Sequence, residues 1–233
     1  MPTVTYQESR NRIENYFDRT AADTWAKLTS DAPVSGIRAT VRAGRDRIRA
    51  TLLSYLPKDL TGARVLDAGC GTGALASEAA SRGADVVAID ISPTLISVAK
   101  ERFQPMVNRG SVMFHAGDML DEAWGAFDFA VAMDSLIHYR NNDIVAALSA
   151  LAPRVSNGIA FTFAPQTPAL SAMHVVGKFF PKSDRSPAIV PISDRRLRSA
   201  IAGASALDDW HVGRSDRVAS GFYTSQAMEL KRS

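Results

Sequence analysis

The clearest chemistry in this chain lies at aspartates that follow short apolar stretches typical of buried strands. Asp67 stands two residues before a turn that contains Gly69 and Gly71, and Asp90 closes the next apolar stretch, 23 residues later (90 − 67). Glycine permits unusual backbone dihedrals and lets a ligand approach the main chain closely. A carboxylate in the place of Asp67 would repel a pyrophosphate, so it favours a ligand with a cationic group. A carboxylate in the place of Asp90 can accept hydrogen bonds from both hydroxyls of a ribose.

A third apolar stretch ends at Asp118, which is followed by Met119. The side-chain acceptor of Asp118 and the backbone N–H of Met119 together can recognise the edge of an adenine. We place Cys70 and Ile91 in the same site, because they adjoin the glycine turn and Asp90. Cys70 needs only to be small there, and we assign it no nucleophilic role. The three strand ends together predict a site for an adenosine compound with a cationic appendage.

A fourth apolar stretch leads into the segment MDSLIHY, residues 133–139. His138 is its obvious polar group, and it can hydrogen-bond a reacting carboxylate or accept its residual proton. The alternative is a histidine that only completes the end of a helix. We also take Tyr139 as a candidate catalytic residue, and Asp134 as a residue on the cofactor side or a helix cap rather than a base.

Strands that alternate with helices must position these residues, which predicts a doubly wound, mainly parallel sheet. The expected strands lie within residues 63–71, 84–92, 112–119, 127–135 and 158–164, with two further strand-like stretches at 209–217 and 221–229 that fit a closing hairpin. The expected helices cover residues 73–82, 93–103, 143–155 and 193–203. The carboxyl ends of parallel strands meet at one edge of a sheet, so the four segments named above should face one crevice.

Two regions lie outside this alternation. Residues 5–30 are polar with spaced aromatics and predict short helices of an N-terminal arm, and residues 38–56 predict an amphipathic helix that Pro57 ends. We therefore divide the chain into an arm and cap, 1–57, and a main domain, 58–233. Residues 165–192, which contain five prolines, interrupt the main domain after the fifth strand, and we expect them to form a lid.

Composition excludes several classes of protein. The chain has 233 residues, 46% of them hydrophobic and 22% charged, which is ordinary for a folded domain. One cysteine excludes an intramolecular disulfide and a metal site of several cysteines. There is no apolar run of about 18 residues and no apolar signal-peptide core, so we expect a cytoplasmic protein. The net charge is only +3, although five arginines lie within residues 38–49. These arginines fit either the solvated face of a helix or a surface that binds an anion.

The strand-end pattern resembles that of the class I S-adenosylmethionine-dependent methyltransferases. That resemblance implies a Rossmann-like seven-stranded α/β sheet with helices on both faces and a final antiparallel strand. It implies that the glycine turn passes beneath the methionine portion of S-adenosylmethionine, with Asp67 close to the ammonium. It further implies that Asp90 holds the ribose, that Asp118 and Met119 hold the adenine, and that Arg42 meets the methionine carboxylate. The product form would be S-adenosylhomocysteine.

Further segments resemble the magnesium-protoporphyrin IX O-methyltransferases of (bacterio)chlorophyll synthesis, a photosynthetic pathway. They are residues 16–25, 41–47, 133–139, 174–185 and 222–230. This resemblance implies methyl transfer to a propionate carboxylate of magnesium protoporphyrin IX, giving the monomethyl ester. The chain departs from the family at Leu28 and Thr29, where relatives often carry an aromatic residue, so no tyrosine role carries over to that position.

The resemblance also implies surroundings for the enzyme. The magnesium belongs to the substrate, and we expect no protein-bound metal. We expect transient contact with magnesium chelatase, which supplies the porphyrin, and peripheral contact with the photosynthetic membrane. The alternatives are the same chemistry on another small molecule, such as a quinone or polyketide hydroxyl, a nucleic-acid methyltransferase, and a cofactor-binding regulator without activity. No Asn-Pro-Pro-Tyr-like segment follows the fourth strand, so we expect no nucleic-acid partner.

Overall fold

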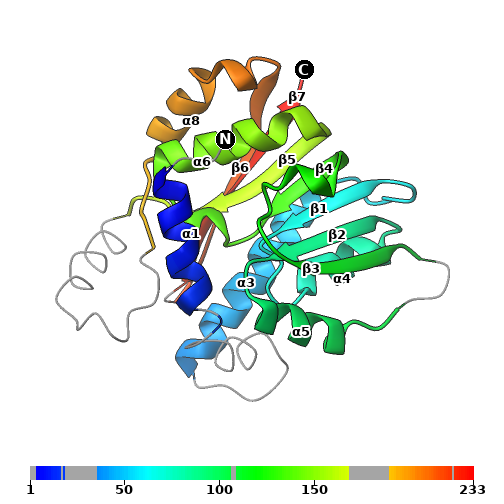
Figure 1. Cartoon of the computed structure of the whole chain (residues 1–233). Helices are drawn as coiled ribbons and strands as arrows, with labels where there is room; N and C mark the ends of the chain where they lie inside the picture. Colours follow the sequence, from blue (N-terminus) through cyan, green and yellow to red (C-terminus); the bar gives the residue numbers. More distant parts are fainter. Residues whose placement is uncertain (1–3, 17, 19–35, 106–108, 168–188, 222) are drawn as a thin grey trace.

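A computed structural model describes residues 4–16, 18, 36–105, 109–167, 189–221 and 223–233. Seven strands form one sheet (Figure 1). They are β1 (Arg64–Ala68), β2 (Asp85–Asp90), β3 (Ser111–Ala116), β4 (Phe127–Ala132), β5 (Val155–Phe163), β6 (Trp210–Ser220) and β7 (Tyr223–Arg232). The described helices are α1 (Val4–Tyr16), α3 (Gly36–Tyr55), α4 (Ala74–Ser81), α5 (Pro93–Arg102), α6 (Asn141–Leu151) and α8 (Asp194–Ala202). Short 3₁₀ turns join them at η2 (Glu122–Trp124), η3 (Leu136–His138), η4 (Ala152–Arg154) and η6 (Ser205–Leu207).

The strand order is β3-β2-β1-β4-β5-β7-β6, and β7 runs antiparallel to both of its neighbours. Strands β1 to β5 are parallel to one another. The chain builds outward from β1 to β3 and then crosses back to β4, so the order reverses between β1 and β4. Ligands of such sheets bind outside the carboxyl ends of the strands at this reversal. The predicted fold class is confirmed, and all seven strands lie where the sequence predicts them to within a few residues.

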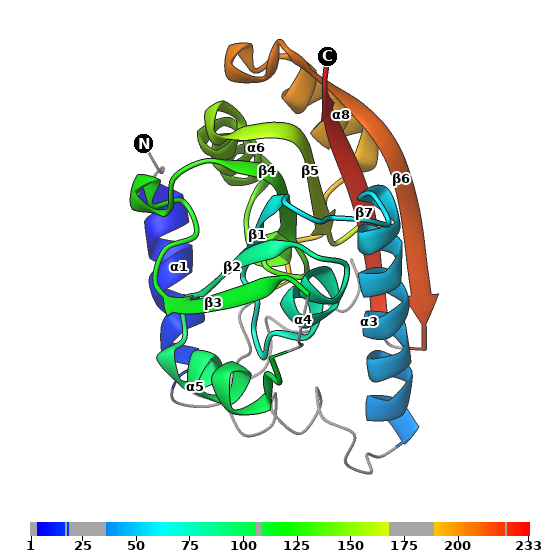
Figure 2. The same ribbon diagram turned by 90° about the vertical axis from the view of Figure 1, so that its right-hand side faces the viewer.

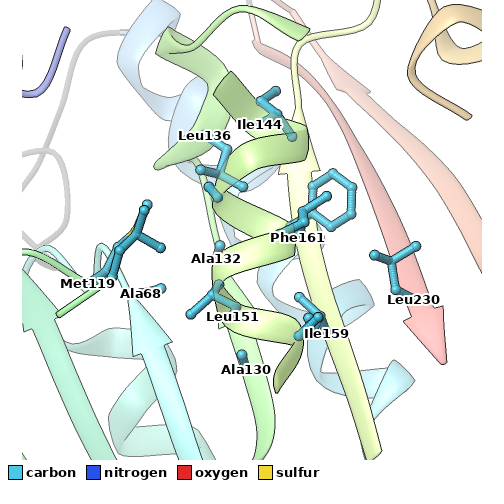
Figure 3. Packing of buried hydrophobic residues seen from close by; sticks show 14 of the residues in the cluster. Ala68, Met119, Ala130, Ala132, Leu136, Ile144, Leu151, Ile159, Phe161 and Leu230 are labelled. Carbon is cyan, nitrogen blue, oxygen red and sulfur yellow. The ribbon is translucent and has the colours of Figure 1, made fainter. Parts of the chain in front are cut away.

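Two apolar clusters cover the two faces of the sheet. One joins α1, α6 and α8 to the sheet, and it includes the fully buried Leu136, Ile144 and Phe161 (Figure 3). The other joins α3, α4 and α5 to the opposite face. Strands buried on both faces explain why β1, β2 and β4 are almost continuously apolar in the sequence. Helices on both faces hold the strand ends in fixed register.

Helix α3 lies along β6 and β7 rather than apart from the sheet (Figure 2). Its Ile48, Leu52 and Leu53 are fully buried, and the hydroxyl of Tyr55 donates to Asp216 of β6 at 2.7 Å. This packing sets its arginine-bearing face beside the carboxyl ends of the strands. The division at residue 57 between an arm and a main domain stays a prediction.

Hydrogen bonds tie the described parts of the arm to the main domain. The hydroxyl of Thr5 donates to the buried Asp143 of α6. Asp18 accepts from the hydroxyl of Thr94 at 2.7 Å and from that of Ser92 at 3.2 Å, at the start of α5. Residues 19–35 of the predicted arm and 168–188 of the predicted lid lie outside the described residues. No described helix is long and apolar enough to cross a membrane.

Candidate active site

A cavity of about 340 Å³ opens at the carboxyl ends of β1, β2, β3 and β4. It brings together every residue that the sequence predicts for the site. These are Arg42, Asp67, Gly69, Cys70, Gly71, Asp90, Ile91, Asp118, Met119, Asp134, His138 and Tyr139. Their convergence follows from the sheet order, because each lies at a strand end beside the reversal or on α3 next to it.

The glycine turn after β1 forms the floor of the cavity. Gly69 has a φ of +85°, and its N–H and that of Cys70 donate to the Ile89 carbonyl at 2.8 and 2.9 Å. A β-carbon on Gly69 would overlap the side chain of Ser135, so only glycine fits there. Burial raises the pKa of the Cys70 thiol well above its usual value, which agrees with a structural rather than a nucleophilic role.

Asp90 ends β2 and shapes the wall beside this turn. One of its carboxylate oxygens accepts from the Gly71 N–H at 2.8 Å, and the other accepts from the Ser92 N–H at 2.9 Å. Burial raises the pKa of Asp90, while these backbone N–H groups lower it by less. Each oxygen keeps a lone pair beyond its backbone partner, so the carboxylate can still accept hydrogen bonds from a ligand.

Asp67 has the most unusual environment among the described carboxylates. Its side chain is 1% exposed, and neither oxygen accepts a hydrogen bond from the part of the chain that the structure describes. Burial, and to a smaller extent the charge of Asp90, raise the pKa of Asp67 to about 7, against a smaller lowering by the backbone N–H of Ala76. A buried carboxylate without a partner is costly unless a cation or a donor meets it. The geometry therefore fits a cationic ligand group at this point.

Asp118 is met by two arm residues that the sequence analysis did not include. The Tyr6 hydroxyl donates to one oxygen at 3.0 Å, and Arg10 forms an ion pair with the other at 3.0 Å. The ring of Tyr6 also stacks on that of Tyr139, with centroids 4.8 Å apart. Both Tyr6 and Arg10 line the cavity, so α1 forms one of its walls. Their spacing of four residues on one helix face is the only signal that the sequence offers for them.

The segment after β4 forms the opposite wall. His138 ends η3 and lines the cavity. Tyr139 is buried, and burial raises the pKa of its hydroxyl, which therefore stays protonated. Asp134 lines the same wall, but its carboxylate is paired with Arg45 of α3 at 2.7 Å.

The two ends of the predicted lid lie beside this wall. The N–H of Gln166 donates to the Ile192 carbonyl at 2.9 Å, and the N–H of Val190 donates to the Ile137 carbonyl at 2.9 Å. The described residues on the two sides of 168–188 therefore pair with each other, and Val190 bonds η3. This position agrees with the predicted covering role, which itself stays a prediction.

The residues present fit S-adenosylmethionine. A buried carboxylate without a partner suits its ammonium, Asp90 keeps acceptor capacity for ribose hydroxyls, and the third strand end holds Asp118 and the backbone of Met119. The glycine turn leaves no side chain between the ligand and the backbone. None of the described His, Cys, Asp and Glu residues form a group that could hold a metal ion.

The sheet order and this site define a class I S-adenosylmethionine-dependent methyltransferase. Residues 65–158 match the family model described as a methyltransferase domain, and residues 132–232 match the model of the magnesium-protoporphyrin IX methyltransferase C-terminus. The chain is 53% identical to the magnesium-protoporphyrin O-methyltransferase of Rhodobacter capsulatus, over 97% of this chain and 98% of the relative. The chain belongs to the magnesium-protoporphyrin O-methyltransferase family.

Two further comparisons show similarity to one enzyme of that family and to one outside it. The crystal structure of magnesium protoporphyrin IX methyltransferase from Synechocystis PCC 6803 with bound SAH superposes with a TM-score of 0.81, at 26% identity, over 97% of this chain and all of that one. A ubiquinone biosynthesis O-methyltransferase from Xanthomonas oryzae is 30% identical over 76% of this chain and 72% of its own length. S-adenosylmethionine is therefore the methyl donor of this enzyme.

We predict that Asp90→Ala weakens the binding of S-adenosylhomocysteine by about 2–4 kcal/mol, because one or two charge-assisted hydrogen bonds are lost. Isothermal titration calorimetry on the folded variant measures this. Asp85→Ala is the matched control, since Asp85 starts the same strand, is exposed and bonds only Ser111 among the described residues. Equal affinities in the two variants would refute the ribose assignment.

We also predict that the affinity of the wild-type protein for S-adenosylhomocysteine rises roughly tenfold between pH 5.5 and 7, as Asp67 ionises. The sign follows from the raised pKa of about 7, because protonated Asp67 must lose its proton before it can pair with an ammonium. This window lies below the pKa of an ordinary α-amino group, so the ligand stays cationic. The same titration with Asp67→Asn should be flat, and a flat wild-type curve would contradict the role of Asp67.

Proposed function

We propose that this enzyme transfers a methyl group from S-adenosylmethionine to a propionate carboxylate of magnesium protoporphyrin IX, giving the monomethyl ester in (bacterio)chlorophyll biosynthesis. The observation that carries the proposal is the 53% identity, over 97% of the chain, to the magnesium-protoporphyrin O-methyltransferase of Rhodobacter capsulatus. The cavity at the strand ends supports the chemistry independently, because its carboxylates suit the methyl donor and its wall after β4 carries a histidine.

The proposed methyl transfer does not need a strong general base. When bound, S-adenosylmethionine supplies a methyl group on a positively charged sulfur, which is already activated. A propionate is ionised at neutral pH, so its oxygen is ready to attack. The protein must therefore align the two groups and exclude water. In our proposal His138 holds the acceptor carboxylate by a hydrogen bond, and the wall of Tyr6 and Tyr139 shields the cavity from solvent.

The charges around the cavity suit an anionic acceptor beside a cationic donor. Arg42, Arg45 and Arg49 of α3 all line it, whereas the carboxylates Asp67 and Asp90 lie on the glycine-turn side. We propose that the acceptor enters beside α3. Arg45 and Arg49 of that helix are already paired with Asp134, Asp46 and Glu78, and Arg42 is expected to meet the methionine carboxylate of the donor, so the helix offers the propionates only a partly neutralised positive charge.

The proposal extends to the surroundings of the enzyme. Magnesium protoporphyrin is a large apolar pigment that is best handed over directly, so we expect transient contact with the magnesium chelatase that produces it. We place the protein in the cytoplasm, with peripheral contact to the photosynthetic membrane. Exposed cations such as Arg47 on α3 and Arg195 and Arg196 on α8 provide a charge that would support contact with an anionic surface.

Incubation with methyl-deuterated S-adenosylmethionine and magnesium protoporphyrin IX tests the proposed function. We expect the pigment to gain the mass of one labelled methyl ester, and the dimethyl ester of the same pigment, which has no free propionate, to gain nothing. Absence of product from the first pigment, with the donor shown to bind, would refute the substrate. Labelling of a quinol under the same conditions would favour the hydroxyl-methylating alternative that the Xanthomonas relative suggests.

We predict that His138→Ala lowers kcat by roughly ten- to a few-hundred-fold, while the affinity for S-adenosylhomocysteine changes little. The donor keeps its own contacts at the first three strand ends, and only the acceptor loses a hydrogen bond. Steady-state kinetics and calorimetry on the same variant separate the two effects.

His211→Ala is the matched control, because His211 is exposed on β6 and does not line the cavity. If turnover of His138→Ala equals that of this control, His138 is structural. If His138→Ala binds the donor and has no measurable turnover at all, the acceptor must lose a proton, which contradicts an ionised carboxylate acceptor.

A further inference from the structure

The turn between β4 and η3 holds an aspartate in a backbone conformation that is rare for its type. Asp134 has a φ of +54°, and it is the only non-glycine with a positive φ in the described parts of the chain. Aspartate enters this left-handed region more readily than most residues, but the conformation is still strained. Such strain persists where surrounding contacts fix it, and it concentrates at functional sites.

Contacts from three distant elements fix Asp134. Its carboxylate is 5% exposed and accepts from Arg45 of α3 at 2.7 Å, and from the Tyr223 hydroxyl of β7 at 2.9 and 3.0 Å to its two oxygens. The hydroxyls of Ser225 in β7 and Thr162 in β5 donate at 3.2 and 3.3 Å. The Thr162 hydroxyl also accepts from the Asp134 N–H at 2.7 Å. The carboxylate is therefore occupied by the protein itself and is poorly suited to act as a base.

The Tyr223 ring packs closely against α3 at Gly44. A β-carbon on Gly44 would overlap the Tyr223 ring, so the helix carries glycine in its interior where glycine ordinarily weakens a helix. Tyr223 itself is not among the described residues that line the cavity. Burial and the charge of Asp134 raise the pKa of the Tyr223 hydroxyl, so it remains a donor.

The turn that Asp134 fixes contacts the glycine turn after β1 and leads into the segment that carries His138. The next residue, Ser135, donates to the Ala68 carbonyl at 2.8 Å and packs against Gly69, the floor of the cofactor turn. The 3₁₀ turn η3 then begins, and His138 is its last residue. A displacement of this turn would move His138 and the cofactor floor relative to each other.

We propose that Tyr223, together with Arg45, is a positioning residue for methyl transfer, because it holds Asp134 and thereby sets the place of His138 against the cofactor turn. The proposal rests on the proposed function for its kinetic effect. In this proposal β7 helps to align the reacting groups, although its Tyr223 does not line the cavity. Misplacement of a reacting group by about 1 Å is enough to cost up to a hundredfold in rate.

The test compares Tyr223→Phe with Tyr55→Phe. Each variant removes one hydroxyl that donates to an aspartate. Tyr223 of β7 donates to Asp134, whereas Tyr55 of α3 donates to Asp216 of β6, which does not line the cavity. We expect Tyr223→Phe to lower kcat on magnesium protoporphyrin about ten- to a hundred-fold, with KM for the pigment and Kd for S-adenosylhomocysteine within about twofold of wild type. We expect Tyr55→Phe to keep wild-type kcat at a similar loss of Tm.

Hydrogen exchange gives a readout that needs no turnover. We expect the amides of residues 135–139 to exchange faster in Tyr223→Phe than in Tyr55→Phe, because only the first variant removes a hydrogen bond to Asp134. Equal kcat in the two variants, or equal exchange in this segment, would overturn the proposal. If wild-type protein fails to methylate magnesium protoporphyrin, the proposed function fails, and the exchange comparison still decides the positioning role.

Discussion

The site depends on one buried carboxylate that the described protein leaves without a hydrogen-bond partner. Asp67 lies one residue before the end of β1, lines the cavity and has its pKa raised to about 7, mainly by burial. A fold tolerates such a group when a ligand completes it, because an uncompensated buried charge opposes folding. The cost of Asp67 in the free protein is thus the source of its affinity for a cation. The other residues that line the cavity determine the shape and orientation of the ligand that carries this cation.

The sheet order decides what surrounds this carboxylate. The reversal between β1 and β4 brings Asp90, which we expect on the donor side, into the same cavity as His138, which we propose on the acceptor side. The fold then closes the cavity with segments from outside the parallel strands. Helix α1 brings Tyr6 over the third strand end, and α3 brings arginines to the mouth. In the proposed function, the cationic donor lies on the glycine-turn side of the cavity and the anionic acceptor approaches beside α3.

Patterns within single segments predicted the strand-end residues, because the carboxyl ends of parallel strands must meet. Asp67, Asp90 and Asp118 needed no more than the strand assignments to be placed together. The contacts of Tyr6 and Tyr223 depend instead on how a helix and a final strand dock onto the sheet, 112 residues from Asp118 and 89 residues from Asp134. The four-residue spacing of Tyr6 and Arg10 puts them on one helix face, but no sequence pattern identifies the partner of Tyr6 or of Tyr223, so only the three-dimensional structure reveals these contacts.

Direct titration of Asp67 tests the central claim. Its carboxyl carbon can be followed by ¹³C NMR in the free protein and with saturating S-adenosylhomocysteine, with Asp67→Asn used to assign the signal. The account predicts a pKa of about 7 in the free protein and a clear fall when the ligand's ammonium pairs with the carboxylate. A pKa near the ordinary 3.8 in the free protein, or one that the ligand leaves unchanged, would contradict it.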